Sequence, residues 1–285
     1  MLTFVEAISL AGDRAKQNDD ACGATRTWGW VIDGATDLHE TPLTNYASDA
    51  AWIATYLSEH LAGSAIAYDI YGANADDLRH ELKSASEALR KDWAADSPIP
   101  FEKWRSPIAS ALVLSEFEER TIELIELGDC RCFMLDADGA VHIAGGPQDA
   151  ADAETQLASL QTDAHKPLLQ REVTVAHLRQ MRASLNREGA HWTFCLDPAC
   201  AKHARTHRFQ LKRPAHLLLM TDGFSALVDR YHAYDAAGLV RTALAMGLQE
   251  LGRELRAIEA ADSGGAKHPR FKASDDATAL LLRLT

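Results

Sequence analysis

The sequence contains no apolar run long enough to span a bilayer. Its start also lacks the basic leader of a signal peptide, because residues 1–14 carry Glu6 early and their apolar residues alternate as in a strand. Positive charge is scarce: 29 Lys and Arg oppose 41 Asp and Glu, which leaves a net charge of −12. Such an acidic chain repels phosphate backbones. We therefore expect no membrane and no nucleic acid among its partners.

Cysteine is also sparse, with five in 285 residues. An odd number in a chain of this length argues against a disulfide framework and favours a reducing compartment, so we expect a cytoplasmic protein. The remaining composition, 47% hydrophobic and 25% charged, is ordinary for a globular protein with a full core. No internal repeat or low-complexity tract divides the chain. We expect a monomer with one domain over residues 1–285.

Hydrophobic periodicity indicates the secondary structure. Apolar and alternating patterns predict strands at 3–10, 28–32, 108–117, 121–127, 131–135, 140–144, 216–220 and 277–284. Spacings of three and four predict helices at 44–61, 74–93 and 235–258, the last with a break at Gly247. Asn74 can cap the second helix. Residues 148–190 are more polar and mostly helical in pattern, and we interpret them as an inserted flap.

The order of these elements predicts a fold class. Successive strands between 108 and 144 are joined by short turns, which requires antiparallel pairing. The helices arrive in groups before and after these strands, so they form layers outside the sheets. We therefore predict an α+β fold in which two antiparallel β-sheets pack as a sandwich, with helices on both outer faces.

Acidic residues recur at the ends of the apolar strands. The sites are Asp33-Gly34, Asp222-Gly223, Asp129, Asp275-Asp276 and, after the first strand, Asp19-Asp20. Carboxylates at strand ends are held rigidly and can converge on one cleft, where like charges stay ionised only if a cation neutralises them. Carboxylate oxygens are the ligands that Mg²⁺ and Mn²⁺ prefer. The pattern thus predicts a site for divalent cations.

Each acidic site also has an ordinary structural interpretation. Asp-Gly is a common turn dipeptide, and we interpret Asp138-Gly139 as a turn alone. Any one of the acidic sites, taken by itself, is more often a turn than a functional site. The ordered combination, with two long apolar strands that each end in Asp-Gly, is what points to function.

These motifs, in this order, resemble those of the metal-dependent protein phosphatases of type 2C, in particular bacterial members. The matching segments are Asn18-Asp19-Asp20-Ala21, Val31-Ile32-Asp33-Gly34, Gly128-Asp129-Cys130-Arg131, Thr221-Asp222-Gly223 and Asp275-Asp276-Ala277-Thr278. Ser110 is similar to the small hydroxyl residue at the strand start that precedes the Gly-Asp motif. The resemblance spans nearly the whole chain. It implies removal of phosphate from phosphoserine and phosphothreonine in phosphorylated protein substrates.

The resemblance also implies two or three Mg²⁺ or Mn²⁺ ions and a set of ligands. The implied metal ligands are Asp19, Asp20, Asp33, Gly34, Asp129, Asp222 and Asp275, of which Asp20, Asp33 and Asp222 are also the implied catalytic residues. Asp33 would bridge two ions, and the carbonyl of Gly34 would contact one of them. The family mechanism is in-line attack on phosphorus by a metal-bridging water, with no phosphoenzyme.

Three positions depart from the family pattern. Ala15 stands where an Arg usually precedes the first motif, so its neighbours Arg14 and Lys16 are the candidate phosphate ligands. Ala35 replaces a common His, and Asp19 replaces a Glu. These departures leave an alternative open: a catalytically weakened phosphatase fold that serves as a regulatory or binding module.

Weaker patterns favour structural over functional interpretations. The spacing of Cys195, Cys200, His203 and His207 can bind zinc, but we favour buried cysteines beside a His-bearing surface. The basic segment 202–212 is interpreted as a solvated face rather than a phosphopeptide dock.

Two further hypotheses about the chemistry concern the sequence around Asp33. His39 can donate a proton near it, although a surface His is the commoner case. A phosphatase with an Asp nucleophile would need a second Asp where Val31 stands, so this reading is discounted.

Overall fold

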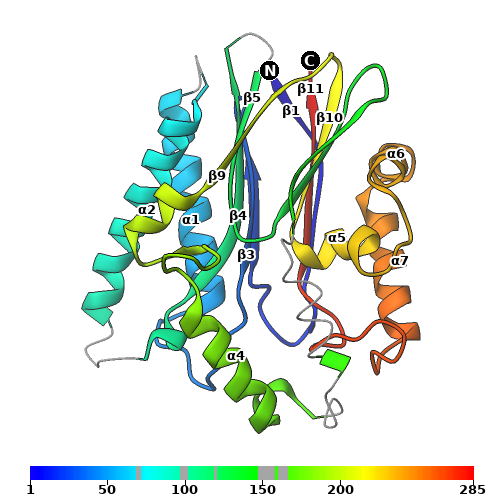
Figure 1. Ribbon diagram of the computed structural model, residues 1–285. Coiled ribbons are helices and arrows are strands. Elements are labelled where there is room, and N and C mark those ends of the chain that lie inside the picture. Colours follow the sequence, from blue (N-terminus) through cyan, green and yellow to red (C-terminus); the bar gives the residue numbers. More distant parts are fainter. Residues whose placement is uncertain (69–71, 97–101, 119–120, 147–157, 160–165) are drawn as a thin grey trace.

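The computed structural model describes residues 1–68, 72–96, 102–118, 121–146, 158–159 and 166–285. Two β-sheets face each other in the centre, and helices lie outside both of them (Figure 1). The predicted sandwich of antiparallel sheets between helical layers is confirmed. Among the described helices, none combines the length and apolar character that crossing a bilayer would require.

The first sheet has five strands. Their spatial order is β1 (Leu2–Leu10), β11 (Ala277–Leu284), β10 (Ala215–Met220), β6 (Arg131–Leu135) and β7 (Val141–Gly145), all antiparallel. Since Leu2 pairs with Leu284, residues 1 and 285 lie side by side at one end of the sandwich (Figure 1).

The second sheet has six strands. Five run in the order β2 (Asp20–Ala24), β3 (Trp28–Gly34), β4 (Ile108–Phe117), β5 (Thr121–Leu127) and β9 (Arg205–Gln210), and the short β8 (Phe194–Cys195) pairs with the start of β4. The basic segment 202–212 therefore contains an edge strand, in which half-buried and exposed residues alternate. Its exposed positions agree with the solvated face expected from the sequence.

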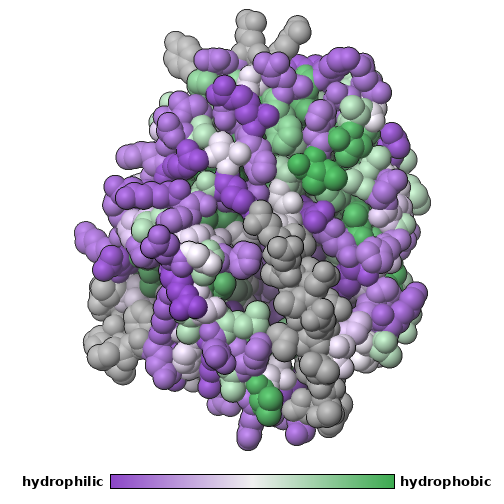
Figure 2. Space-filling view, viewed as in Figure 1, coloured by the Kyte–Doolittle hydropathy of each residue, from purple (hydrophilic) through white to green (hydrophobic). Residues whose placement is uncertain are grey.

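Buried apolar residues form three layers. One lies between the sheets. A second lies between the second sheet and helices α1 (Asp49–Ala65) and α2 (Ala75–Asp96), and a third between the first sheet and helices α5 (Asp222–Asp229), α6 (Ala236–Met246) and α7 (Leu248–Ala261). The outer surface over α2 is mainly hydrophilic (Figure 2), as expected for helices that bury one apolar stripe.

Helix boundaries show where the sequence prediction succeeded and failed. Asn74 caps α2 as predicted, because its side-chain oxygen accepts the N–H groups of Asp76 and Asp77 at 2.8 and 3.1 Å. The break between α6 and α7 falls at Gly247, whose φ is 84°. The predicted start of the first helix at residue 44 is wrong, because Ser48 caps α1 by accepting the N–H of Ala51 at 2.9 Å.

Apart from short 3₁₀ helices, four elements were absent from the prediction: β2, β8, β9 and α5. The short helices are η1 (Ile66–Tyr68), η2 (Lys103–Arg105), η3 (Leu168–Gln170) and η4 (Pro198–His203), and a longer helix, α4, spans Glu172–Ser184. Of the predicted flap at 148–190, residues 148–157 and 160–165 lie outside the described part. Its described part contains η3 and α4, which is consistent with the helical pattern.

Because neighbouring strands are antiparallel, the ends of some strands and the starts of others meet at one end of the sandwich. This end lies opposite the two chain termini (Figure 1). Strands β1, β3, β5 and β10 end there, and β2, β4, β6 and β11 begin there. Every acidic motif found in the sequence lies at one of these positions.

Candidate active site

Asp20 and Asp33 are partners in the ladder between β2 and β3. One carboxylate oxygen of Asp20 accepts the hydroxyl of Thr221 from the other sheet at 2.8 Å. The other oxygen, Oδ1, is buried and has no hydrogen-bond partner among the described residues. A buried carboxylate oxygen without a partner is costly unless a cation is present, so it fits a metal ligand.

The second Asp-Gly motif begins helix α5 rather than forming a turn. Asp222 is the first helical residue, where a negative charge interacts favourably with the helix dipole. A Cβ at Gly223 would lie 1.9 Å from the carbonyl oxygen of Asp276, so only glycine allows this approach of α5 to the segment before β11.

Asp129 lies in the loop between β5 and β6. Its carboxylate accepts the hydroxyl of Ser110 at 2.6 Å, and Ser110 is the β4 partner of Asp33. Ser110 therefore fixes the side chain of Asp129 beside Asp33. Arg131, from the same motif, forms an ion pair with Asp229 of α5 at 3.0 Å.

Two adjacent carboxylates before β11 have different partners. Asp275 Oδ1 accepts the ammonium of Lys272 at 2.5 Å. Asp276 accepts the N–H groups of Gly12 and Asp19, each at 2.7 Å, and so holds the loop between β1 and β2. Neither Lys272 nor this role of Asp276 could be predicted, because neither follows from spacing along the chain.

Asp19 is held close to Gly34. The N–H of Gly34 donates to the carbonyl of Asp19 at 3.2 Å, and a Cβ at residue 34 would lie 2.6 Å from that oxygen. Glycine is thus required here by close approach of two backbones. The hydroxyl of Ser48 donates to the carboxylate of Asp19.

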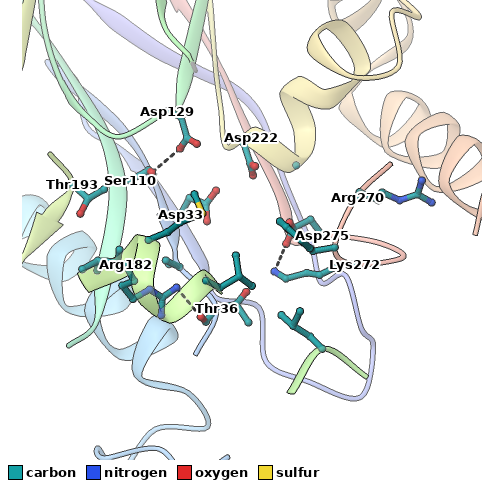
Figure 3. Close-up of a pocket in the computed structure, with 18 of the residues that line it drawn as sticks. Asp33, Thr36, Ser110, Asp129, Arg182, Thr193, Asp222, Arg270, Lys272 and Asp275 are labelled. Carbon is teal, nitrogen blue, oxygen red and sulfur yellow. Dashed lines mark hydrogen bonds and ion pairs between the residues drawn. The ribbon is translucent and has the colours of Figure 1, made fainter. Parts of the chain in front are cut away.

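A cavity of about 310 Å³ collects most of the predicted residues. Asp33, Asp129, Asp222 and Asp275 point into it from both sheets (Figure 3). A neighbouring cavity of about 480 Å³ is lined by Arg14, Lys16, Asp19, Lys272, Asp275 and Asp276, among others. The structure thus separates Arg14 and Lys16, which are exposed and line only the second cavity, from Asp33 and Asp222.

The electrostatics of this cluster favour a bound cation. Burial, followed by the charges of Asp20 and Asp222, raises the pKa of Asp33 well above its usual range. Burial, with the charge of Asp276, does the same for the pKa of Asp20 and raises the pKa of Asp19 to about 6. Burial also acts to raise the pKa of Asp275, but the ion pair with Lys272 lowers it overall. A divalent cation would relieve this repulsion.

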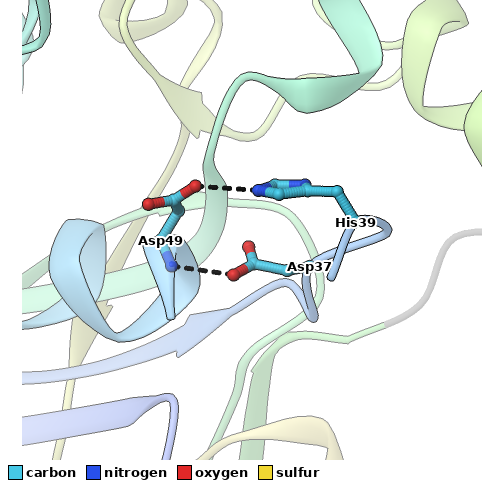
Figure 4. Close-up of side chains that lie close together, drawn as sticks. All are labelled: Asp37, His39 and Asp49. Carbon is cyan, nitrogen blue, oxygen red and sulfur yellow. Dashed lines mark hydrogen bonds and ion pairs between the residues drawn. The ribbon is translucent and has the colours of Figure 1, made fainter. Parts of the chain in front are cut away.

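Three other side chains place potential metal-ligand atoms close to one another. Asp37, His39 and Asp49 form the one such cluster in the described residues whose ligand atoms all lie within 4.8 Å of one another (Figure 4). Asp49, however, accepts the N–H groups of Leu43 and Thr44 at 2.9 to 3.0 Å, besides His39 at 2.9 Å.

Asp37, His39 and Asp49 therefore form a hydrogen-bond network at the start of helix α1. Hydrogen bonds from the chain already use the carboxylate oxygens of Asp49. The expectation of a surface His39 is wrong, since its side chain is 7% exposed and paired with Asp49. His39 lines neither cavity, so it is not placed to donate a proton there.

The zinc-like pattern does not form a site in the described residues. Cys195 and Cys200 are buried, but His203 stacks on Trp192 at 3.7 Å and His207 pairs with Glu126 at 2.9 Å. Buried cysteines beside a His-bearing surface describe this region, as the sequence favoured.

Helix α4 covers one side of the cavity, a feature that the sequence did not reveal. Arg179 donates to the carbonyl of Leu38 at 2.6 Å and lies over the ring of Trp104 at 4.1 Å. Arg182 donates to the carbonyl of Thr36 at 2.9 Å and lines the cavity (Figure 3). Both arginines fasten α4 to the loop that follows β3.

Comparison with known proteins identifies the class. A family model described as protein phosphatase 2C matches residues 13–256, so the chain belongs to this family. It is a metal-dependent serine/threonine protein phosphatase by family, as the order of its motifs implied. No curated protein matched the sequence.

Solved structures with this fold share little sequence with the chain. The serine/threonine phosphatase PstP/Ppp of Mycobacterium tuberculosis has 15% identity and a TM-score of 0.61, over 99% of this chain and 98% of its own. The PstP catalytic domain in complex with two manganese ions has 16% identity and a TM-score of 0.55, over 99% and 97%. RsbX in complex with magnesium has 12% identity and a TM-score of 0.50, over the full length of both chains.

Proposed function

We propose that this chain hydrolyses phosphoserine and phosphothreonine monoesters in proteins with two or three bound Mg²⁺ or Mn²⁺ ions. The single observation that supports this most is that carboxylates from both sheets face one cavity while a buried oxygen of Asp20 has no hydrogen-bond partner among the described residues. The proposed metal ligands are Asp19, Asp20, Asp33, Gly34, Asp129, Asp222 and Asp275.

Individual roles follow from position. Asp33 lies between Asp20 on β2 and Ser110 on β4. As the family resemblance implies, it would help to hold two of the ions. Asp20, Asp33 and Asp222 are the proposed catalytic residues. When bound, the cations would lower the pKa of an attacking water and neutralise charge at phosphorus. Thr221 and Ser110 orient Asp20 and Asp129 by hydrogen bonds.

The choice of ions has support from relatives of the fold. PstP was solved with two manganese ions and RsbX with magnesium. Ligand sets made only of oxygen atoms suit both ions. Because Mg²⁺ keeps several waters, the carboxylates need not all contact the ion directly. Arg14 and Lys16 line the neighbouring cavity, and we propose that they attract the anionic substrate.

The remaining assignments concern the whole chain. We propose one phosphatase domain over residues 1–285, acting as a cytoplasmic monomer on phosphorylated proteins in signal transduction. The five cysteines are all free, which suits a reducing compartment. The segment at about 148–190 is the proposed flap, and the contacts of α4 beside the cavity support a role in substrate selection.

The alternative of a weakened regulatory module is less well supported. It rests on Ala15 and Asp19, whereas Asp33, Asp129, Asp222 and Asp275 are all retained. A protein that no longer bound cations would have no reason to keep so many carboxylates in mutual repulsion.

The direct test is hydrolysis of an aryl phosphate and of a phosphothreonine peptide with Mn²⁺, with Mg²⁺ or with excess chelator. We expect turnover only with a cation. Asp138→Asn, at an exposed turn, is the control and should match the wild type. Full activity in excess chelator would disprove the metal-dependent mechanism.

A further inference from the structure

Positive charge around the cavity comes from few side chains. The cavity is lined by four described cationic residues: Arg182, Arg230, Arg270 and Lys272. Arg182 donates to the carbonyl of Thr36 and so fastens α4 to the loop after β3. Arg270 is committed to its own loop, because its guanidinium donates to the carbonyls of Ala273 and His268 and to Asp262.

Lys272 differs from the other cations by its position. Among the described cationic residues, it alone lines both cavities, and the two cavities also share Asp275. Its side chain reaches into the cavity with the nitrogen toward Asp275 (Figure 3). The ammonium can donate three hydrogen bonds, yet within the described part of the chain it donates to Asp275 alone. Two donors therefore remain for a ligand.

The loop that carries Lys272 is fixed on both sides. Arg270, which is buried, ties residues 259–273 together through its five hydrogen bonds. Arg171 donates to the carbonyl of Phe271 at 2.9 Å, and Arg256 donates to that of Asp275 at 2.8 Å. A cation on such a loop is preorganised and loses little freedom on binding an anion.

We propose that the ammonium of Lys272 binds the phosphate group of the substrate. This inference rests on the proposed function and assigns to Lys272 the role for which the sequence suggested Arg14 or Lys16. Asp275 would also hold the cation, so its charge would be shared between the ion and the ammonium of Lys272. A phosphate dianion would then give this ammonium a further counter-charge. Arg14 and Lys16 line only the second cavity, which lacks Asp33, Asp129 and Asp222.

The test measures binding without turnover. Inorganic phosphate is titrated calorimetrically into the Mn²⁺-loaded wild type and into Lys272→Met, Lys272→Gln and Lys272→Arg. Lys267→Met is the matched control, because Lys267 is an exposed residue of the same loop that lines neither cavity. Mn²⁺ affinity of each variant is measured separately.

We expect both neutral variants to bind phosphate about tenfold more weakly, with Mn²⁺ affinity not reduced. Lys272→Arg should retain most of the affinity, and Lys267→Met all of it. The Michaelis constant for an aryl phosphate should rise in parallel, with a smaller effect on kcat.

Three results would overturn the inference: unchanged phosphate affinity in the neutral variants, an equal loss in Lys267→Met, or a loss of phosphate affinity that merely follows a loss of Mn²⁺ affinity. Failure of the proposed function looks different. In that case the wild type would bind phosphate through Lys272 but would not hydrolyse esters when Mn²⁺ is present.

Discussion

Asp33 and Asp275 line the same cavity but have opposite electrostatic surroundings. Asp275 is compensated by Lys272, whereas the charges that act most strongly on Asp33 are those of other carboxylates. The deficit of positive charge is therefore greater around Asp33 than around Asp275. A divalent cation should bind where carboxylates lack compensation, which makes the charge of Asp33 important for metal binding.

Asp33→Asn and Asp222→Asn should each lower kcat by about a hundredfold or more, because catalysis at such a site is mostly electrostatic. The measurement is steady-state hydrolysis of an aryl phosphate at saturating Mn²⁺, with circular dichroism to establish that each variant is folded. Wild-type turnover in either variant would remove that residue from the site.

Asp19 provides a pH-dependent prediction for the metal-free protein. Its pKa in the folded state is raised to about 6 from its usual value of 3.8, mainly by burial. The folded state therefore holds a proton more tightly than the unfolded state. Its contribution to stability is fully present below about pH 4 and is lost as the pH rises through 6. We expect the wild type in chelator to lose about 2–3 kcal/mol relative to Asp19→Asn between pH 4 and pH 7.

This difference is measured by urea unfolding of both proteins at each pH. Both proteins contain the same other titratable groups, so the difference between their unfolding free energies reports mainly the titration of Asp19. A constant difference between the two proteins across this range would contradict the raised pKa.

The carboxylates of the site could be read from the sequence, but their partners could not. Asp33 and Asp222 follow long apolar runs, and such runs are buried strands whose ends can be located. Lys272 occurs in a polar loop without periodicity, and Arg182 in a helical segment whose pattern does not indicate what the helix packs against. They reach the cavity only because this loop and α4 fold back over the strand ends. Such placement depends on tertiary packing, which leaves no local pattern.

At the scale of elements, the start of α1 shows how one buried side chain organises a loop. Asp49 is fully buried in the first turn, and its carboxylate holds residues 43 and 44 by their N–H groups. The predicted helix began at residue 44 because apolar spacing extends that far. The structure delays it to residue 49, since Asp49 and Ser48 give the chain better hydrogen-bond partners than a further helical turn would.

Asp49→Ala should destabilise the protein by about 2–4 kcal/mol, because it leaves several buried donors without an acceptor. Thermal unfolding measures this. Asp76→Ala is the matched control, since Asp76 is also in the first turn of a helix but is 91% exposed, and it should have little effect. Mn²⁺ affinity should be unchanged in Asp49→Ala. Loss of Mn²⁺ binding would instead make Asp37, His39 and Asp49 a metal site.

Strand prediction succeeded where both faces are buried and missed three strands of the second sheet, of which β2 and β9 lie at its edges. The bounds of β4, β5 and β11 agree with the apolar patterns because nearly all their residues are in the core. β9 is an edge strand whose Arg205 and His207 pair with Glu126 of β5. Ion pairs take the place of apolar contacts there, so no hydrophobic alternation signals the strand.

At the scale of the whole molecule, the candidate metal site joins the two sheets. Asp20 and Asp33 belong to the second sheet, Asp129 lies in the loop that connects the second sheet to the first, and Asp222 and Asp275 adjoin strands of the first. A cation bound between them would link the sheets at the end opposite the termini, where carboxylates repel each other and add to a net charge of −12. Cation binding should therefore act on global stability as well as on activity.

Mn²⁺ should raise the melting temperature of the wild type, and an ion concentration of a hundred times Kd corresponds to about 2.7 kcal/mol. Asp33→Asn should show little of this rise, yet it should melt higher than the wild type in chelator because one repulsive charge is gone. Potassium chloride at matched ionic strength separates specific binding from screening of the net charge. If it produces the same rise in both proteins, the cation acts by screening alone. A rise that needs both Mn²⁺ and Asp33 would mean that the ion binds the folded state at the junction of the two sheets.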